Sequence, residues 1–240
     1  MIHAELDARA VWLVADLHLR PDRPAEVAAF ASQLDALPAA CEALVVLGDL
    51  VDAWAGPGGW DEAGFEELVA AFRRLEGRGV QAWVLRGNRD VLLEPGDLGP
   101  LGARLADSLR VEAAEPGAGA ALLSHGDEYC LRDRPYQRLR RALRWRPLRA
   151  LLRGLPGPLR RTLARRMRRV SAGAVARKPL DSMTLVDEAV GEALGAHGAE
   201  RAVIGHLHRE ERRDLAGGGR LEVLPAWGPG SPPRPLRAGI

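Results

Sequence analysis

Four of the six histidines in this 240-residue chain fall in short polar clusters, most of which also contain acidic or amide side chains. The clusters are Asp16-Leu17-His18, Gly48-Asp49-Leu50-Val51-Asp52, Gly87-Asn88-Arg89-Asp90, His125-Gly126-Asp127 and Gly205-His206-Leu207-His208. Carboxylate, imidazole and amide groups suit manganese, iron, zinc or cobalt, and the clusters lack the thiolates of a structural zinc site. Cys41 and Cys130 have no paired spacing, so they are interpreted as reduced thiols without a chemical role.

Seven side chains of these clusters are candidate ligands, too many for one ion, so two metal ions are expected. In the arrangement that we predict, Asp49 bridges the two ions. One ion is held by Asp16, His18 and His208, and the other by Asn88, His125 and His206. A single cluster is a weak signal, because a Gly-Asp turn is usually only a turn, but five in this order are a strong one.

These clusters need elements that bring them together, and each one follows a short apolar run. Strands are predicted at 11–15, 44–47, 82–85, 120–124, 202–205 and 221–224, and helices from about residue 24, within 60–75 and near 181–197. The alternation of strands and helices is typical of a layered α/β fold. Because ligands in such folds bind at the carboxyl ends of the strands, the five clusters are expected to converge on one site.

The order D-x-H, G-D-x-x-D, G-N-x-D, H-G-D and G-H-x-H closely resembles that of the calcineurin-like metallophosphoesterase superfamily, over residues 16–208. The resemblance implies a two-sheet core flanked by helices, with a dinuclear metal centre bridged by an aspartate and a hydroxide. Two-metal sites generate a nucleophile at neutral pH and clamp the attacking and leaving oxygens of a phosphoryl displacement. The expected chemistry is hydrolysis of a phosphoester or a phosphoanhydride.

Arg89 narrows the expected substrate. Many members of the superfamily have histidine at this third position of G-N-x-D, where it can protonate a departing alcohol. An alkoxide needs that proton, whereas a phosphate, whose second pKa is about 6, leaves readily as an anion. Because an arginine can hold a second phosphate and stabilise its charge, Arg89 favours cleavage of an anhydride. The simpler alternative is a surface arginine that pairs with Asp90.

Residues 87–90 and 125–137 resemble, more narrowly, the UDP-2,3-diacylglucosamine hydrolase family of lipid A biosynthesis. This resemblance implies attack of a metal-bridged hydroxide on the α-phosphorus of UDP-2,3-diacylglucosamine, which releases UMP and 2,3-diacylglucosamine 1-phosphate, with two divalent ions, Mn²⁺ being the expected metal. It assigns catalytic roles to Asp49, Asn88, Arg89 and His206. Substrate contacts carry over to Asn88, Arg89, Asp133, Tyr136, Ser171, Lys178 and His206. Two departures are Val175, where the family tends to have asparagine, and the loop 53–60, which lacks the acidic run common in the family.

Residues 132–169 contain 15 arginines and one acid, a net charge of +14 in a chain whose total is +2. Leucines alternate with the arginines, and prolines and glycines break the segment into helical pieces. The family resemblance implies an inserted basic helical cap, placed at residues 132–178 within a single domain of residues 1–240. Two interpretations stay open and are compatible: a hairpin that packs its leucines on the core, and a cap that binds lipid.

The predicted partners are the lipid-linked sugar nucleotide and the inner leaflet of the membrane, to which the arginines of the cap would attach a cytoplasmic protein peripherally. No apolar stretch approaches the 18 residues of a spanning helix, and the first residues resemble no signal peptide. Nucleic acid is not expected as a partner, because Trp145 and Tyr136 alone offer rings for base stacking among the arginines. Residues 228–240 are expected to be poorly ordered.

Other functions are compatible with the same motifs. The nearest alternative is a metallophosphoesterase that acts on a soluble nucleotide or on another phosphodiester or pyrophosphate. A nuclease would use the arginines on a polyphosphate backbone. A non-catalytic scaffold would have no need of the complete ligand set. A composition of 47% hydrophobic and 28% charged residues excludes a disordered chain, and the oligomeric state is left open.

Overall fold

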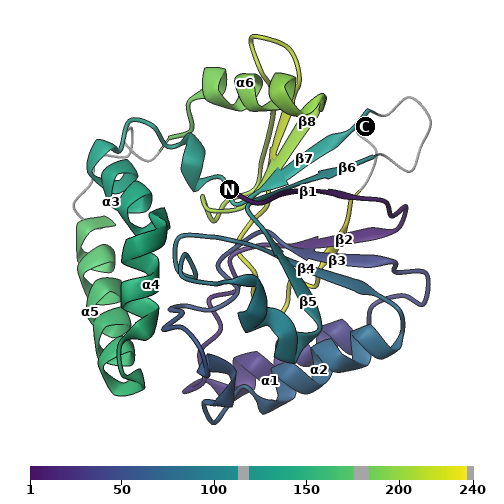
Figure 1. Cartoon of the computed structure of the whole chain (residues 1–240). Coiled ribbons are helices and arrows are strands. Elements are labelled where there is room, and N and C mark those ends of the chain that lie inside the picture. The colour runs from purple at the N-terminus through teal and green to yellow at the C-terminus, as the bar shows by residue number, and fades with distance from the viewer. Residues whose placement is uncertain (113–118, 176–183, 237–240) are drawn as a thin grey trace.

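The computed structural model describes residues 1–112, 119–175 and 184–236, and from 169 to 175 only the backbone. Within these residues the strands form two sheets (Figure 1). The six-stranded sheet has the order β1 (His3–Leu6), β6 (Ser108–Val111), β7 (Ala121–Ser124), β8 (Arg201–Ile204), β10 (Arg220–Val223) and β9 (Glu211–Asp214). The five-stranded sheet has the order β11 (Arg234–Pro235), β2 (Val11–Val14), β3 (Ala43–Val46), β4 (Gln81–Leu85) and β5 (Ala103–Ala106).

The two sheets pack face to face, and helices cover their outer faces (Figure 1). Helices α1 (Pro24–Asp35) and α2 (Glu66–Gly77) pack on the five-stranded sheet, and α6 (Asp187–His197) packs on the six-stranded one. Val45 faces the core between the sheets, whereas Leu44 on the same strand faces the helices. Burial on both faces explains why these strands are continuous apolar runs rather than alternating ones.

The central strands run in register and in one direction. In the five-stranded sheet β2, β3, β4 and β5 are parallel, and in the six-stranded sheet β7 is parallel to β8. The loops that follow β2, β3, β4, β7 and β8 carry the five polar clusters. Parallel strands place these loops at the same end of each sheet, so the topology itself gathers the clusters.

The predicted α/β core of two sheets flanked by helices is confirmed. Each predicted strand occurs within one residue of its expected limits. The helix expected near 181–197 begins at Asp187, and residues 181–183 lie outside the described part of the chain. The expectation of a poorly ordered tail is wrong for residues up to 236, because β11 pairs with β2 and the Leu236 N–H donates to the Val11 carbonyl at 2.7 Å.

Beside the core lie three helices, α3 (Arg134–Arg144), α4 (Arg146–Gly154) and α5 (Gly157–Val175), which we call the cap (Figure 1). Each has proline as its second residue, where the missing N–H has no intrahelical partner to lose. Short 3₁₀ turns lie at η1 (Gly59–Asp61), η2 (Pro95–Leu101) and η3 (Asp127–Tyr129). None of the helices in the described part of the chain combines the length and the apolar character needed to cross a membrane.

Candidate active site

The polar clusters meet at one end of the sheets, as their positions after strands predict. Asp16 and His18 follow β2, and Asp49 follows β3. Main-chain hydrogen bonds tie the loops together: the His18 N–H donates to the Asp49 carbonyl at 2.9 Å, and the Gly205 N–H donates to the His125 carbonyl at 3.1 Å. Neighbouring loops therefore hold one another at the site.

The backbone at the site is unusual. Five non-glycine residues have positive φ, between 49° and 66°, and they are the only ones in the described part of the chain: Asp16, His18, Asp49, His206 and His208. A left-handed backbone is costly for such residues and persists where the surrounding structure imposes it. All five are predicted metal ligands, so the strain marks the same positions as the sequence motifs.

Three of the predicted ligands form a first group. Donor atoms of Asp16, His18 and His208 lie within 4.8 Å of one another. His18 Nε2 is 3.1 Å from His208 Nε2, and His208 Nε2 is 3.6 Å from Asp16 Oδ1. This is the set that the sequence predicts for one ion.

The remaining predicted ligands form a second group. The oxygen Oδ1 of Asn88 lies 2.9 Å from His125 Nε2 and 3.0 Å from His206 Nδ1. Asp49 lies between the groups, with Oδ1 3.7 Å from His125 Nε2 and Oδ2 3.8 Å from His18 Nδ1. This position suits the bridging role predicted for Asp49, which stays a prediction.

One detail differs from the predicted division. Donor atoms of Asp16, Asp49 and His125 also lie within 4.8 Å of one another, so Asp16 is close to both groups. The structure thus brings all seven predicted ligands together without separating them into two exclusive sets.

The electrostatics of the site fit bound cations. Oδ1 of Asp16 and Nδ1 of His18 are buried without a hydrogen-bond partner in the described residues. Burial, reinforced by the neighbouring carboxylates, raises the pKa of Asp49 to about 7. Burial works against a charged His125, but the carboxylates of Asp49 and Asp16 outweigh it and raise the pKa of His125 to about 9. A buried cluster of carboxylates that favours the cationic form of a neighbouring histidine also favours positive ions.

Two of the histidines are held in the form that binds metals. Burial lowers the pKa of His18 to about 4 and that of His206 to about 4. Both rings are therefore neutral at pH 7, which leaves a nitrogen lone pair available. The Nδ1–H of His125 donates to the Leu47 carbonyl at 2.8 Å, which leaves Nε2 directed to the site.

Glycines at the site make room for ligand side chains. A Cβ on Gly48 would lie 2.5 Å from His125 Nδ1, and one on Gly87 would collide with the carboxylate of Asp49. Ligand groups of neighbouring loops therefore occupy the space that a side chain at either position would need.

Sequence reasoning considered Asp90 only as a partner of Arg89 and gave no role to Asp127. Asp90 is fully buried and accepts the N–H of Gly87 at 2.7 Å and of Leu50 at 3.0 Å, so it joins two ligand loops. Asp127 accepts Nε of Arg140 at 2.7 Å. Burial alone would raise the pKa of Asp127, but Arg140 holds it far below the usual range. The sequence feature that could have indicated these roles is that Asp90 ends the G-N-x-D motif and Asp127 ends the H-G-D motif.

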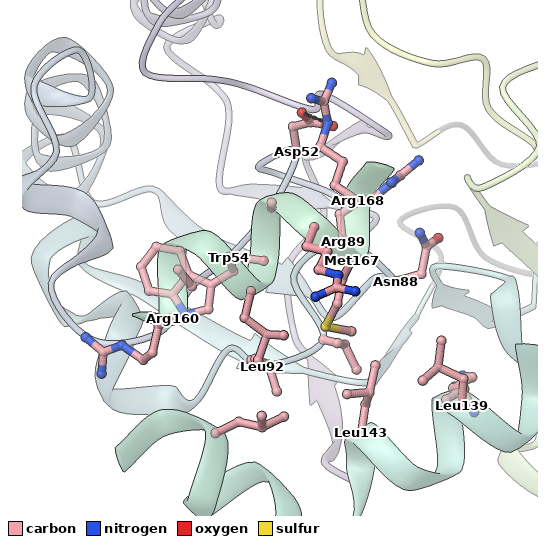
Figure 2. A pocket seen from close by; sticks show the side chains of 18 of the residues that line it. Asp52, Trp54, Asn88, Arg89, Leu92, Leu139, Leu143, Arg160, Met167 and Arg168 are labelled. Atoms are coloured by element: carbon pink, nitrogen blue, oxygen red, sulfur yellow. Dashed lines mark ion pairs between the residues drawn. The ribbon is translucent and has the colours of Figure 1, made fainter. Parts of the chain in front are cut away.

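A cavity of about 500 Å³ lies between the cap and the core. Its walls are mainly apolar, with Leu139 and Leu143 from α3, Met167 from α5 and Leu92 from the core (Figure 2). At its polar end, Asn88 and Arg89 connect the cavity to the ligand groups. Leucines of the cap therefore line a cavity beside the core, and lipid binding by the cap stays a prediction.

Arg89 offers a charged group to a substrate in this cavity. Its Nε is buried without a hydrogen-bond partner, and the residue forms no ion pair with any described residue. Asp90 bonds to backbone N–H groups instead, so the alternative of an Arg89–Asp90 pair is not what the structure contains. A half-buried guanidinium without an ion pair among the described residues suits an anion.

The other predicted substrate contacts are placed less simply. The hydroxyl of Tyr136 lines the cavity and donates to Asp127. Asp133 is buried and caps α3 by accepting the Tyr136 N–H at 3.2 Å, a structural role that the sequence interpretation missed. Ser171 lies in α5, but its side chain is outside the described part of the structure, as are Lys178 and the side chain of Val175.

Comparison with known proteins agrees with this geometry. The profile of the calcineurin-like phosphoesterase family matches residues 10–210. A UDP-2,3-diacylglucosamine hydrolase from Pseudomonas paraeruginosa is 36% identical over 224 residues, covering 91% of each chain. One from Stutzerimonas stutzeri is 37% identical over 211 residues, covering 85% of this chain and 84% of that one.

A solved structure, the phosphopantetheinyl hydrolase from Mycobacterium tuberculosis, has a TM-score of 0.47 at 13% identity and covers 95% of this chain and 96% of that one. The family profile spans all five polar clusters, and the match to the hydrolase from Pseudomonas paraeruginosa covers 91% of this chain. The chain therefore belongs to the calcineurin-like phosphoesterase family and is a metal-dependent hydrolase of the branch that contains the UDP-2,3-diacylglucosamine hydrolases.

Proposed function

We propose that this enzyme hydrolyses the pyrophosphate bond of UDP-2,3-diacylglucosamine and releases UMP and 2,3-diacylglucosamine 1-phosphate. The observation that supports this most directly is the cavity between cap and core, which is mainly apolar and has Asn88 and Arg89 where it meets the ligand groups. Acyl chains suit walls of leucine and methionine, because their burial releases water from apolar surface. The relatives that are 36–37% identical are named for this substrate.

We propose that the seven ligands hold two divalent ions, with Mn²⁺ as the expected metal because carboxylate, imidazole and amide donors suit it. Such ions, when bound, activate water and neutralise charge on phosphoryl oxygens. Asp49 would bridge them. Oδ1 of Asn88 lies 3.0 Å from Nδ1 of His206, and Asn88 lines the cavity. From there the two side chains can also orient the phosphoryl group. Arg89 would hold the departing phosphate, whose charge needs no proton.

The remaining substrate contacts are proposed from the family resemblance alone. They are Asp133, Tyr136, Ser171 and Lys178. We also retain residues 132–178 as the proposed extent of the cap, within one domain of residues 1–240. The described cap helices lie inside that range.

The decisive experiment compares acylated and deacylated UDP-glucosamine as substrates, with release of UMP as the measurement. Filling the cavity should raise kcat/KM for the diacylated compound by at least about tenfold, because each buried CH₂ contributes about 0.8 kcal/mol. Equal or better turnover of water-soluble nucleotides would refute the lipid substrate and leave the soluble-substrate alternative. Elemental analysis of the purified enzyme identifies its metal.

We further propose that the cap attaches the enzyme peripherally to the cytoplasmic leaflet of the inner membrane. Large apolar side chains are exposed on the cap among its arginines: Trp145 is 63% exposed, Leu151 65% and Leu159 51%. Apolar side chains enter the lipid interface while arginines bind anionic headgroups. Co-sedimentation with vesicles that contain anionic lipid should decrease in a Trp145→Ala/Leu151→Ala variant, and unchanged sedimentation would contradict this attachment.

A further inference from the structure

A second cavity, of about 520 Å³, lies on the other side of α5. Its walls come from the loop after β2, the loop after β3 and the face of α5 that carries Arg161 and Arg165. It shares Asp52, Trp54 and Arg168 with the apolar cavity, so α5 stands between two adjoining cavities. Figure 2 shows Asp52 and Arg168 side by side at this boundary, where they form an ion pair.

The two cavities differ in chemistry. Seven of the fifteen residues that line the second one are charged: Arg20, Asp22, Asp52, Glu62, Arg161, Arg165 and Arg168. Some of these groups satisfy each other, since Nε of Arg20 donates to Asp22 at 2.8 Å and lies 4.0 Å from Asp52. An acyl chain would strip water from these charges without replacing its hydrogen bonds, and that cost excludes it. A polar ligand with donors and acceptors suits the cavity.

The walls of the second cavity continue directly from the ligand loops. Leu19 and Arg20 follow the predicted ligand His18, and Asp52 is the third residue after Asp49. The Leu19 N–H donates to the Leu50 carbonyl at 3.1 Å, which keeps the two loops side by side. The second cavity therefore lies along the same two loops that carry His18 and Asp49, close to the ligand groups.

Resting on the proposed function, we infer that the second cavity binds the nucleoside half of the sugar nucleotide. The substrate has an apolar end and a polar end, joined by the pyrophosphate that must lie at the ligand groups. When the acyl chains occupy the apolar cavity, the uridine has the charged cavity left to it. The carboxylates can accept the ribose hydroxyls, and the guanidinium groups can donate to the uracil carbonyls.

The size and the unused donors of the second cavity agree with this assignment. A volume of about 520 Å³ falls within the range of about 300–1,000 Å³ found for small-molecule sites. Arg161 and Arg165 form no ion pair with a described residue, so their guanidinium groups are available. On its other side α5 lines the apolar cavity with Leu163 and Met167.

The test is a calorimetric titration of the Mn²⁺-loaded full-length protein with UMP. An Arg161→Ala/Arg165→Ala variant is compared with an Arg138→Ala/Arg146→Ala variant, which removes the same charge from exposed positions of the same cap. Loss of charge-assisted hydrogen bonds should raise the Kd for UMP about tenfold or more in the first variant only. Inhibition by 2,3-diacylglucosamine 1-phosphate should stay unchanged in both.

Three results are distinguishable. Equal UMP affinity in the two variants overturns the inference, even where the wild type releases UMP from the acylated substrate. Intact UMP binding with reduced sedimentation on anionic vesicles also overturns it, because the arginines then serve lipid headgroups. Failure of the wild type to hydrolyse the acylated sugar nucleotide refutes the proposed function instead, and the UMP titration is independent of that assay.

Discussion

Arg89 differs from the other polar side chains at the site, because its charge has no partner among the described residues. The backbone N–H of the same residue donates to Asp49 Oδ1 at 2.8 Å, so its position is fixed from the ligand side while its side chain stays available. The sequence predicted contact with a substrate phosphate from the arginine at the third position of the G-N-x-D motif. It did not predict that Asp90 would be occupied by backbone N–H groups, since that depends on how two loops pack.

The Arg89→Ala variant is expected to lose activity without losing metal. A charge-assisted hydrogen bond contributes about 1.5–3 kcal/mol, so kcat/KM for the acylated sugar nucleotide should fall about 10- to 100-fold. Arg89→Lys keeps the charge but not the planar fork, and should recover part of the loss. Loss of metal in Arg89→Ala, measured by elemental analysis, would instead assign the residue a structural role.

Gly48→Ala tests whether the glycines protect the ligand geometry. The new Cβ would meet His125, and the residue has φ +84°, so the variant should lose about 1–3 kcal/mol of stability and most of its bound metal. Gly96→Ala is the matched control, because a Cβ there meets nothing within 4 Å. Similar melting temperatures for the two variants would contradict this reading of the glycine.

Among the elements, apolar runs in the sequence predicted the limits of the central strands to within one residue. Strands that exist because of long-range pairing were not predicted. Strand β9 is highly charged and is held by its antiparallel partner β10. Strand β11 is two residues long and exists because it pairs with β2. Neither has a local pattern that distinguishes it from a loop. The cap helices were predictable in outline from proline positions, but not the contacts that dock them.

Asp97 of η2 is one of those contacts, because it joins the cap to the aromatic wall of the cavity. Nη2 of Arg153, in α4, donates to Asp97 Oδ1 at 2.9 Å, and Nε1 of Trp54 donates to Asp97 Oδ2 at 3.3 Å. The main-chain carbonyl of Asp97 accepts Nε1 of Trp60 at 2.7 Å. A single buried aspartate therefore positions α4 and two indole rings.

Removing Arg153 should loosen that junction. In Arg153→Ala the buried carboxylate of Asp97 loses its ion pair, at an expected cost of about 1–3 kcal/mol of unfolding free energy. The exposed Arg146 of the same helix provides the control, and Arg146→Ala should change stability by less than about 0.5 kcal/mol. Denaturant unfolding measures both, and equal midpoints would show that the ion pair contributes nothing.

In the whole molecule, some arginines of the cap form ion pairs with the core, and others form none with any described residue. Within the described residues, five of them pair with carboxylates of the core: Arg140 with Asp127, Arg144 with Asp107, Arg149 with Glu94, Arg153 with Asp97 and Arg168 with Asp52. The sequence showed the charge of the segment but not this division, which follows from which helix faces meet the core. Only the remaining arginines can serve the membrane or a ligand.

Metal should stabilise the whole fold, because the ligand groups come from five loops. At about 100 times its Kd, a ligand of the native state adds about 2.7 kcal/mol, which for a protein of this size raises Tm by roughly 5–10 °C. Thermal unfolding with and without Mn²⁺ measures the shift. Asp49→Asn should abolish most of it, and an equal shift in that variant would remove Asp49 from the ligand set.

The left-handed backbone at five of the predicted ligands has a consequence for descendants of this chain. Glycine at any of those positions relieves about 1–2 kcal/mol of local strain while deleting the side chain that does the chemistry. In the metal-free protein, glycine at one of these positions is thus expected to preserve folding. A variant of this kind can therefore be purified as a folded protein although it has lost its hydrolase activity.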